Sequence, residues 1–407
     1  TPLMHAAQFS TSPEIVTLLL EKGAEVNARN EIGMTVLMVA AVKSTTPEIV
    51  ALLLEKGAEI EARGNFGWTP LIFAAQFSTS PEIVTLLLEK GAEIEARTND
   101  GQTPLMLAVR FSSTPEIITL LLEKGAEVNA RDKLVQTPLM FAARNSTSPE
   151  IVTLLLEKGA EIEARDTDGL TPLMSAARHS TTPEIVTLLL EKGAEFEARA
   201  KSGETLLMVA AAKSTTPEIV KLLLEKGAEL EARDNFGQTV LMVASAKSTT
   251  PEIVTLLLEQ DAELEARSND GGTPLMLAAG SSTTPEIVTL LLEKGAEIDA
   301  RDDGGSTPLM HAAGFSSTPE IVTRLLAKGA EIEARDKYGQ TPLMTAAAMS
   351  MTPEIVALLL AKGADPLAKD ENGKKAIDYA QKNDKLKGTP AFRELRKRSK
   401  EGWWPFG

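Results

Sequence analysis

The chain has 407 residues, and its 57 Asp and Glu outnumber its 42 Lys and Arg, so the formal net charge is −15. A hydrophobic fraction of 43% with only 16 aromatic residues predicts a packed, aliphatic core. No apolar run approaches the roughly 20 residues that a membrane-spanning helix needs. The absence of cysteine excludes disulfides, thiolate metal ligands and cysteine nucleophiles.

One segment recurs every 34 residues along the chain. A fixed period in this range predicts stacked supersecondary units that bury their apolar faces against each other. We expect eleven repeats in 1–374, a capping repeat in 375–388 and a basic tail in 389–407, with no domain boundary inside the array. Residue 1 falls in mid-repeat, which is compatible with a further segment upstream. The copies are anchored at Thr1, Thr35, Thr69, Thr103, Thr137, Thr171, Thr205, Thr239, Thr273, Thr307 and Thr341, with a degenerate twelfth at Lys375.

Each repeat predicts two helices and a turn. In the third unit, Thr69 is a good N-cap for a first helix with Pro70 at its first position. The hydroxyl of Ser80 is predicted to cap a second helix, which should end near Gly91, because glycine suits a helix C-terminus. Residues 92–102 then project as a turn, called a finger below. Stacked copies of this unit predict an all-α solenoid.

Two repeats depart from the pattern at positions where the others have glycine. Val135 replaces the finger glycine of one unit, and a β-branched residue at a positive φ is costly. This finger is therefore predicted to adopt another shape, either as a decayed turn or as an apolar tip used in binding. Asp261 replaces the glycine after a second helix, where the left-handed conformation costs a non-glycine residue on the order of 1 kcal/mol.

The repeated segments Thr-Pro-Leu-x-x-Ala-Ala and Glu-Ile-Val-x-Leu-Leu-Leu-Glu-Lys-Gly-Ala-Glu resemble the ankyrin repeat over all eleven units. The resemblance implies a solenoid of helix-turn-helix units with projecting fingers. It also implies a scaffold without catalysis that binds proteins through the fingers and the inner, concave surface of the first helices. Methionine stands where the family usually has histidine, so the hydrogen bonds of that histidine between turns are expected to be absent. The period is 34 rather than the common 33.

The two residues after the Ala-Ala pair vary between repeats, whereas the core positions barely change. These 22 positions hold six Lys or Arg, four Phe and no acid. They predict a locally basic and aromatic inner surface, because aromatic residues and Arg are enriched at binding hot spots. The alternative is that the cations are ordinary solvated surface residues. The candidate partner-binding residues, with two finger aromatics included, are Phe9, Lys43, Phe66, Trp68, Phe77, Arg110, Phe111, Arg144, Arg178, His179, Lys213, Lys247 and Phe315.

Aromatic residues concentrate in the N-terminal third of the chain. Phe66 and Trp68 flank the glycine of one finger, and Phe77 and Phe111 lie on neighbouring first helices, so the four are expected to form one patch. Phe73 and Phe141 occupy another column, whose spacing along the helix predicts that they belong to the core.

Nothing in the sequence indicates a catalytic or cofactor site. The three histidines lie in distant repeats, and no phosphate-binding loop, zinc-ligand spacing or catalytic triad is present. We therefore expect no enzyme and no cofactor.

The C-terminal segment reverses the charge of the chain. From Lys374 onward there are ten Lys or Arg and four Asp or Glu. A polar closing helix is predicted near Lys375, and a second helix is predicted after the cap at Thr389. The tail, with Trp403 and Trp404, is expected to pack on the acidic outer columns of the last repeats. Alternatives are a docking peptide for a second protein and an interfacial membrane contact.

Together these features predict a monomeric protein-protein interaction scaffold, acting as an inhibitor or a recruiter. Its partner should be a protein with an acidic or apolar segment, with no nucleic acid and no membrane span involved. A structural rod with no dedicated ligand is the alternative that near-identical repeats favour, and an engineered ankyrin-type binder is another. The sequence leaves the compartment open between cytoplasmic and secreted or periplasmic.

Overall fold

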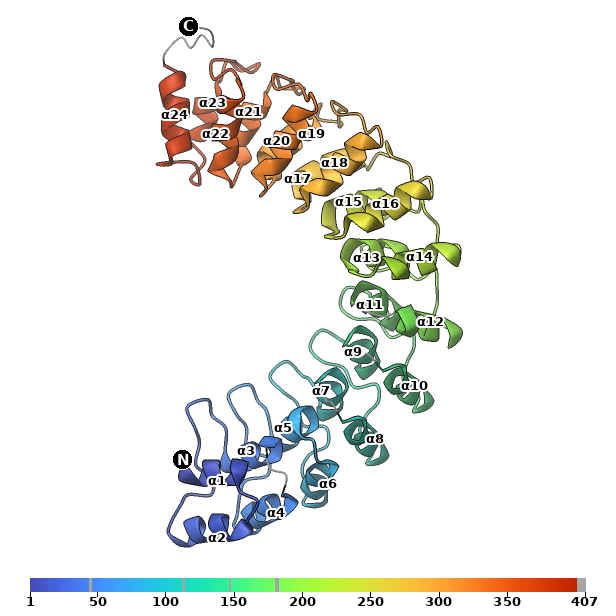
Figure 1. Ribbon diagram of the computed structural model, residues 1–407, viewed down its shortest axis with the longest axis vertical. Helices are drawn as coiled ribbons and strands as arrows, with labels where there is room; N and C mark the ends of the chain where they lie inside the picture. Colours follow the sequence, from blue (N-terminus) through green and yellow to red (C-terminus); the bar gives the residue numbers. More distant parts are fainter. Residues whose placement is uncertain (44–45, 112–113, 146–147, 180–182, 401–407) are drawn as a thin grey trace. The chain divides into compact units, whose positions relative to one another are not determined.

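The structure is a computed structural model that describes residues 1–43, 46–111, 114–145, 148–179 and 183–400. The chain forms two compact units, Thr1–Phe196 (unit 1) and Glu197–Gly407 (unit 2). In both units each repeat contributes a first helix, a second helix and a finger, as predicted (Figure 1). Every helix in the described part of the chain is too short to cross a bilayer.

Unit 1 contains six helix pairs. Its first helices are α1 (Pro2–Phe9), α3 (Val36–Lys43), α5 (Pro70–Phe77), α7 (Pro104–Phe111), α9 (Pro138–Asn145) and α11 (Pro172–His179). Its second helices are α2 (Pro13–Glu21), α4 (Pro47–Glu55), α6 (Pro81–Glu89), α8 (Pro115–Glu123), α10 (Pro149–Glu157) and α12 (Pro183–Glu191). Each first helix packs against the next first helix, and each second helix against the next second helix. The result is two parallel rows, with the fingers extending from the row of first helices (Figure 1).

Unit 2 repeats this arrangement and ends with two closing helices. Its first helices are α13 (Leu206–Lys213), α15 (Val240–Lys247), α17 (Pro274–Ser281), α19 (Pro308–Phe315) and α21 (Pro342–Met349). Its second helices are α14 (Pro217–Glu225), α16 (Pro251–Glu259), α18 (Pro285–Glu293), α20 (Pro319–Ala327) and α22 (Pro353–Ala361). The closing helices are α23 (Ala376–Ala380) and α24 (Pro390–Arg398).

The two helices of a repeat begin in different ways. The Thr69 hydroxyl accepts the N–H of Ile72 at 3.4 Å, as an N-cap should. The predicted cap at Ser80 is wrong, because its hydroxyl donates to the carboxylate of Glu82 and accepts no helix N–H. The fixed φ of proline at the first position, rather than a side-chain cap, therefore starts the second helix.

The core is aliphatic, as predicted. In the third repeat Leu71, Ile83, Val84 and Leu87 are completely buried, and equivalent residues are buried in the neighbouring repeats. Burying such a side chain contributes about 1.5–3 kcal/mol. Because these residues pack against the adjacent repeat, no repeat can form its core alone. Phe141 belongs to this core, as predicted, with 1% of its surface exposed.

Backbone hydrogen bonds join neighbouring fingers within each unit. The N–H of Asn99 donates to the carbonyl of Phe66 at 2.9 Å, and the N–H of Lys133 donates to the carbonyl of Asp100 at 3.0 Å. Within a finger, an aspartate accepts two backbone N–H groups and closes the turn: Asp132 accepts those of residues 134 and 136 at 2.9 and 2.8 Å.

The finger with Val135 keeps the shape of the others, so the predicted change of shape is wrong. Val135 has a φ of 63°, and its N–H donates to the carbonyl of Asp132 at 3.0 Å. The N–H of Thr167 also donates to the carbonyl of Leu134 at 3.0 Å, as in other fingers. Hydrogen bonds on both sides thus hold a β-branched residue in the left-handed region. Asp261, with a φ of 62°, is left-handed as predicted.

Arginines in the first half of the fingers tie neighbouring repeats together. In unit 1, Nη1 of Arg63 donates to the carbonyl of Gly67 in its own finger at 3.4 Å and to that of Arg97 in the next repeat at 2.8 Å. Each such arginine closes its own finger and fixes the next repeat against it. Residues that make this pair of bonds are Arg29, Arg63, Arg97, Arg199, Arg233, Arg267, Arg301 and Arg335.

The C-terminal helix α24 folds back on the last repeat, as predicted. It packs against α22 and α23, and its Leu395 is completely buried. Nη1 of Arg398 donates to the carbonyl of Leu360 in α22 at 3.0 Å. Helix α24 therefore continues the row of second helices rather than the row of first helices. Trp403 and Trp404 lie outside the described residues.

Candidate protein-binding surface

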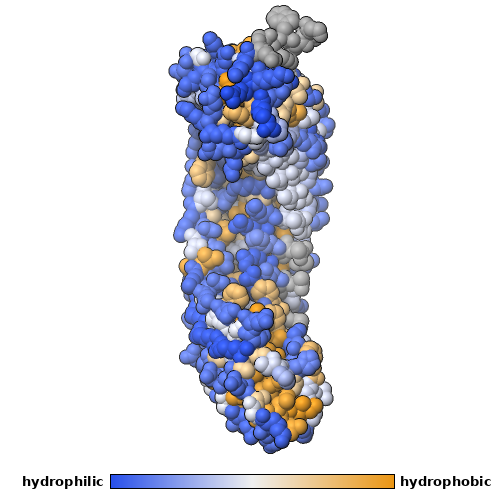
Figure 2. Space-filling model, turned by 90° about the vertical axis from the view of Figure 1, so that its left-hand side faces the viewer, coloured by the Kyte–Doolittle hydropathy of each residue, from blue (hydrophilic) through white to orange (hydrophobic). Residues whose placement is uncertain are grey.

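Most of the predicted binding residues lie at the ends of first helices. Because successive first helices pack side by side within a unit, their last residues form a row. This row and the adjoining fingers are called the inner face below. Figure 2 views this side of the molecule and shows hydrophobic side chains gathered towards its lower end, which holds the N-terminal repeats of unit 1.

Three aromatic rings cluster on the inner face of unit 1. The ring centroid of Trp68 lies 5.0 Å from that of Phe73 and 6.1 Å from that of Phe77, and the latter two are 6.4 Å apart. Trp68, from a finger, also packs on the buried core beneath it. Phe73 is only partly buried, so its assignment to the core is wrong. Phe73 and Val39, which holds the equivalent position in α3, instead line a hollow on this face.

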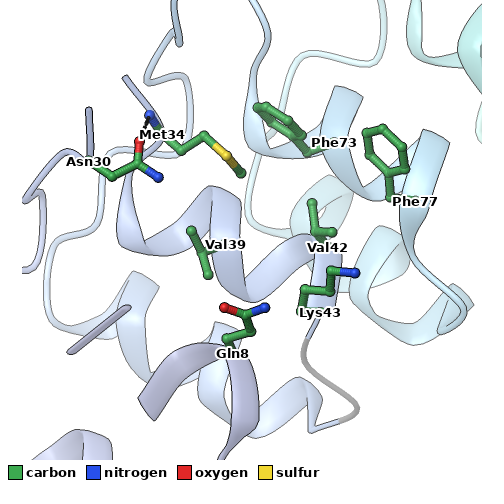
Figure 3. A pocket seen from close by; sticks show the side chains of 8 residues that line it. All are labelled: Gln8, Asn30, Met34, Val39, Val42, Lys43, Phe73 and Phe77. Atoms are coloured by element: carbon green, nitrogen blue, oxygen red, sulfur yellow. Dashed lines mark hydrogen bonds between the residues drawn. The ribbon is translucent and has the colours of Figure 1, made fainter. Parts of the chain in front are cut away.

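An open hollow of about 370 Å³ adjoins this cluster. Figure 3 shows the thioether of Met34 and the rings of Phe73 and Phe77 around it. Lys43 stands at its edge and makes no hydrogen bond or ion pair with any described residue. The hollow therefore offers apolar walls with a cation beside them. Its lining comes from α1, α3, α5 and the first finger: Gln8, Asn30, Met34, Val39, Val42, Lys43, Phe73 and Phe77.

Phe66 and Phe111 stand apart from the aromatic cluster. Phe66 is 71% exposed on its finger, and Phe111 is 50% exposed beside Arg110. Neither makes a ring contact with Trp68 or Phe77 among the described residues, so the expected patch of four aromatic residues forms only in part. Both rings remain available to a ligand.

Three arginines continue the inner face along α7, α9 and α11. The guanidinium carbons of Arg110 and Arg144 lie 5.6 and 5.4 Å from the centroid of the buried Phe141 ring. The Nε atoms of Arg110 and Arg178 are buried without a hydrogen-bond partner. Burial lowers the pKa of Arg144 below its usual value, and the positive charges of Arg110 and Arg178 lower it further.

Comparison with known families identifies this architecture. The family description "Ankyrin repeats (3 copies)" matches residues 1–64, 37–132, 132–200, 207–302, 241–336, 275–370 and 309–390. The chain belongs to the ankyrin repeat family. Ankyrin repeats are generally protein-protein interaction modules, and the family is typically non-enzymatic. A comparison with curated proteins found no match.

In the ankyrin repeats of unit 2 the inner face is less cationic than its sequence suggests. Nζ of Lys247 lies 3.1 Å from a carboxylate oxygen of Glu204, which comes from a finger. The variable positions at the ends of the first helices hold no acid, but Glu204 in a finger forms an ion pair with Lys247. Lys213 is exposed, and Phe315 is 60% exposed with its ring 6.1 Å from that of His311.

The remaining two predicted residues lie at helix ends in unit 1. Phe9 is 64% exposed, and its ring centroid is 4.8 Å from that of His5. His179 is exposed at the end of α11, directly after Arg178. Within the described residues no group of three acidic, His or Cys residues could hold a metal ion.

Of the eight residues that line the hollow, only Lys43 and Phe77 are among the predicted binding residues, and sequence reasoning missed Asn30 and Met34 in particular. Met34 occupies the finger position just before the anchoring threonine, where Trp68 stands in the second repeat and Gln102 in the third. This position varies between repeats as much as the helix ends do. The same variability that pointed to the helix ends could therefore have identified it.

Proposed function

We propose that this ankyrin repeat chain is a non-enzymatic scaffold that binds a protein partner on the inner face of unit 1, as a recruiter or an inhibitor. The observation that carries the proposal is the open, aromatic-walled hollow beside Lys43, continued by the row of Arg110, Arg144 and Arg178. Arg and aromatic residues are enriched among the few residues that dominate binding energy at protein interfaces. The partner segment should therefore combine apolar anchors with acidic residues.

Exposed rings distinguish this proposal from a structural rod. Phe66, Phe77 and Phe111 are 71%, 47% and 50% exposed in one region of unit 1. A rod without a ligand gains nothing from the exposed ring of Phe77 beside the apolar hollow, and contiguous exposed apolar surface of this kind marks a binding site. In the proposal the chain acts as a monomer and its partner is a protein rather than a nucleic acid, since the chain as a whole is acidic.

Charge reversal on the inner face tests the proposal. Full-length chain would carry Arg110→Glu, Arg144→Glu and Arg178→Glu, and would be used with wild type to capture proteins from the source lysate. The control reverses three exposed cations at the ends of the second helices, and so makes the same change in net charge. These are Lys90→Glu, Lys124→Glu and Lys158→Glu.

A protein retained by wild type and by the control, but lost from the inner-face variant, is the expected result. With that protein purified, the inner-face variant should associate more slowly and with a weaker salt dependence, because long-range charge attraction mainly sets the association rate. Equal retention by all three chains would place the partner elsewhere. Retention of nothing by wild type would favour the rod.

A further inference from the structure

The arginines at the ends of α7, α9 and α11 form a column of like charges without carboxylate partners. Arg110, Arg144 and Arg178 are each about half-buried, and none makes a hydrogen bond or ion pair with a described residue. Arginines elsewhere in the structure, such as Arg63, use their guanidinium groups to tie repeats together. Arg110, Arg144 and Arg178 make no hydrogen bonds of this kind to the described residues of other repeats.

Nearby acids do not neutralise the column. Asp132 and Asp166 attract Arg144 electrostatically from the bases of two fingers. Each has an oxygen occupied by two backbone N–H groups of its own finger, and neither forms an ion pair with the column. Three guanidinium groups thus share one face at a cost in desolvation and mutual repulsion, and those of Arg110 and Arg144 lie over the ring of Phe141. An anionic ligand would offset that cost.

The spacing of the column constrains the shape of the ligand. Neighbouring packed helices lie about 8–10 Å apart. A polyproline II segment advances about 3.1 Å per residue with three residues per turn, so every third side chain points the same way at intervals of about 9 Å. A β-strand alternates its faces with a period of two, which sends every third side chain to the opposite side. Polyproline II geometry therefore matches the column and a β-strand does not.

We propose that the column formed by Arg110, Arg144 and Arg178 binds a polyproline II segment of the partner protein that carries a carboxylate at every third residue. The proposal rests on the proposed function and specifies its ligand. Planar guanidinium groups can hold carboxylates through two parallel hydrogen bonds. The half-exposed ring of Phe111, beside Arg110, provides the aromatic surface against which prolines pack.

Peptides of equal composition test the spacing. Each would have three Glu in a Pro-rich background: at every third position, at every second position, or in one consecutive run. Binding to the full-length chain would be followed by fluorescence anisotropy. The every-third peptide should bind at least about tenfold more tightly than the other two, which corresponds to about 1.4 kcal/mol. Similar affinities for all three would overturn the proposal, because they indicate unspecific charge attraction.

Variants of the middle arginine test the site. Arg144→Met should lose the preference for the every-third peptide, and Arg144→Lys should keep the charge but weaken binding, since an ammonium group cannot form the paired hydrogen bonds. Lys158→Met, an equal loss of charge at the end of α10, should change nothing. Circular dichroism would confirm that each variant is folded. An unchanged preference in Arg144→Met would overturn the assignment.

Competition experiments test whether the arginine column prefers the carboxylates of a peptide or the phosphates of other ligands. Inorganic phosphate and single-stranded DNA would be added to the complex with the every-third peptide, each at matched ionic strength. If either displaces the peptide at a lower concentration than unlabelled peptide does, the column is a phosphate or nucleic-acid site and the proposal is wrong. If no peptide binds while the inner-face variant still loses its captured partner, this inference fails and the proposed function stands.

Discussion

Replacing Val135 by glycine should stabilise unit 1. A left-handed conformation costs an ordinary L-residue about 1–2 kcal/mol, and Val135 adopts it at a φ of 63°. Glycine removes that strain but loses about 0.4–1 kcal/mol through the greater freedom of the unfolded chain. The net gain for Val135→Gly should be about 0.5–1 kcal/mol. The turn needs no rearrangement, because the finger already has the shape of the glycine-containing fingers.

Thermal and urea unfolding of the full-length chain would measure this gain, and hydrogen exchange of the finger amides would locate it. The control is Val135→Ala, which shortens the side chain but leaves a Cβ in the left-handed region, so it should recover less than glycine does. Equal stabilisation by alanine and glycine would mean that the valine side chain, rather than the backbone, is the source of strain. No gain in either variant would refute the reasoning.

Three further changes have predictable outcomes. Glu95→Asn should raise the free energy of unfolding at neutral pH by less than about 1 kcal/mol, which would be measured as a higher melting temperature. Glu95 accepts the N–H of Glu127 at 2.7 Å while burial raises its pKa, and Asn129, at the equivalent position, accepts such a bond and donates another without a charge. The folded state holds the Glu95 proton more tightly than the unfolded chain does, so the advantage should disappear as pH falls through the folded pKa. Asp261→Gly should slow hydrogen exchange at the end of α16, with a smaller gain than at Val135 because aspartate tolerates the left-handed region better. Leu395→Ala should cost about 2–5 kcal/mol and detach α24, which would appear as a lower melting temperature of the last repeats.

The helices were predictable because residue types that favour helix ends stand at the helix boundaries of each repeat. Thr69 with Pro70 marks a first helix and Gly91 marks the end of a second, and the structure places both as expected. The shape of the Val135 finger was not predictable from that residue alone. Its conformation is imposed by hydrogen bonds that Asp132 accepts and by hydrogen bonds to the two neighbouring fingers, which a local rule for valine does not include.

The candidate surface was predictable in its position but not in its contacts. Variation between repeats located Phe77 and the arginine column, whereas the pairing of Lys247 with Glu204 joins residues from different repeats and could not be seen in one column. The arginines that tie repeats together were visible in the sequence as an Ala-Arg pair that recurs in the fingers of the first ten repeats. Their role still required the structure, since the acceptors are backbone carbonyls of the next repeat, as for Arg63.

The central claim is that the partner lies on the first helices and not on the second. Site-specific photo-crosslinking tests it most directly, with benzoylphenylalanine placed at Phe77 or Phe111 on the inner face and at the exposed Glu89 or Glu123 at the ends of α6 and α8. Each chain would be irradiated in the presence of the partner captured by wild type. Adducts from positions 77 and 111, with none from 89 and 123, are the predicted result. Adducts from 89 or 123, with none from 77 and 111, would contradict the account.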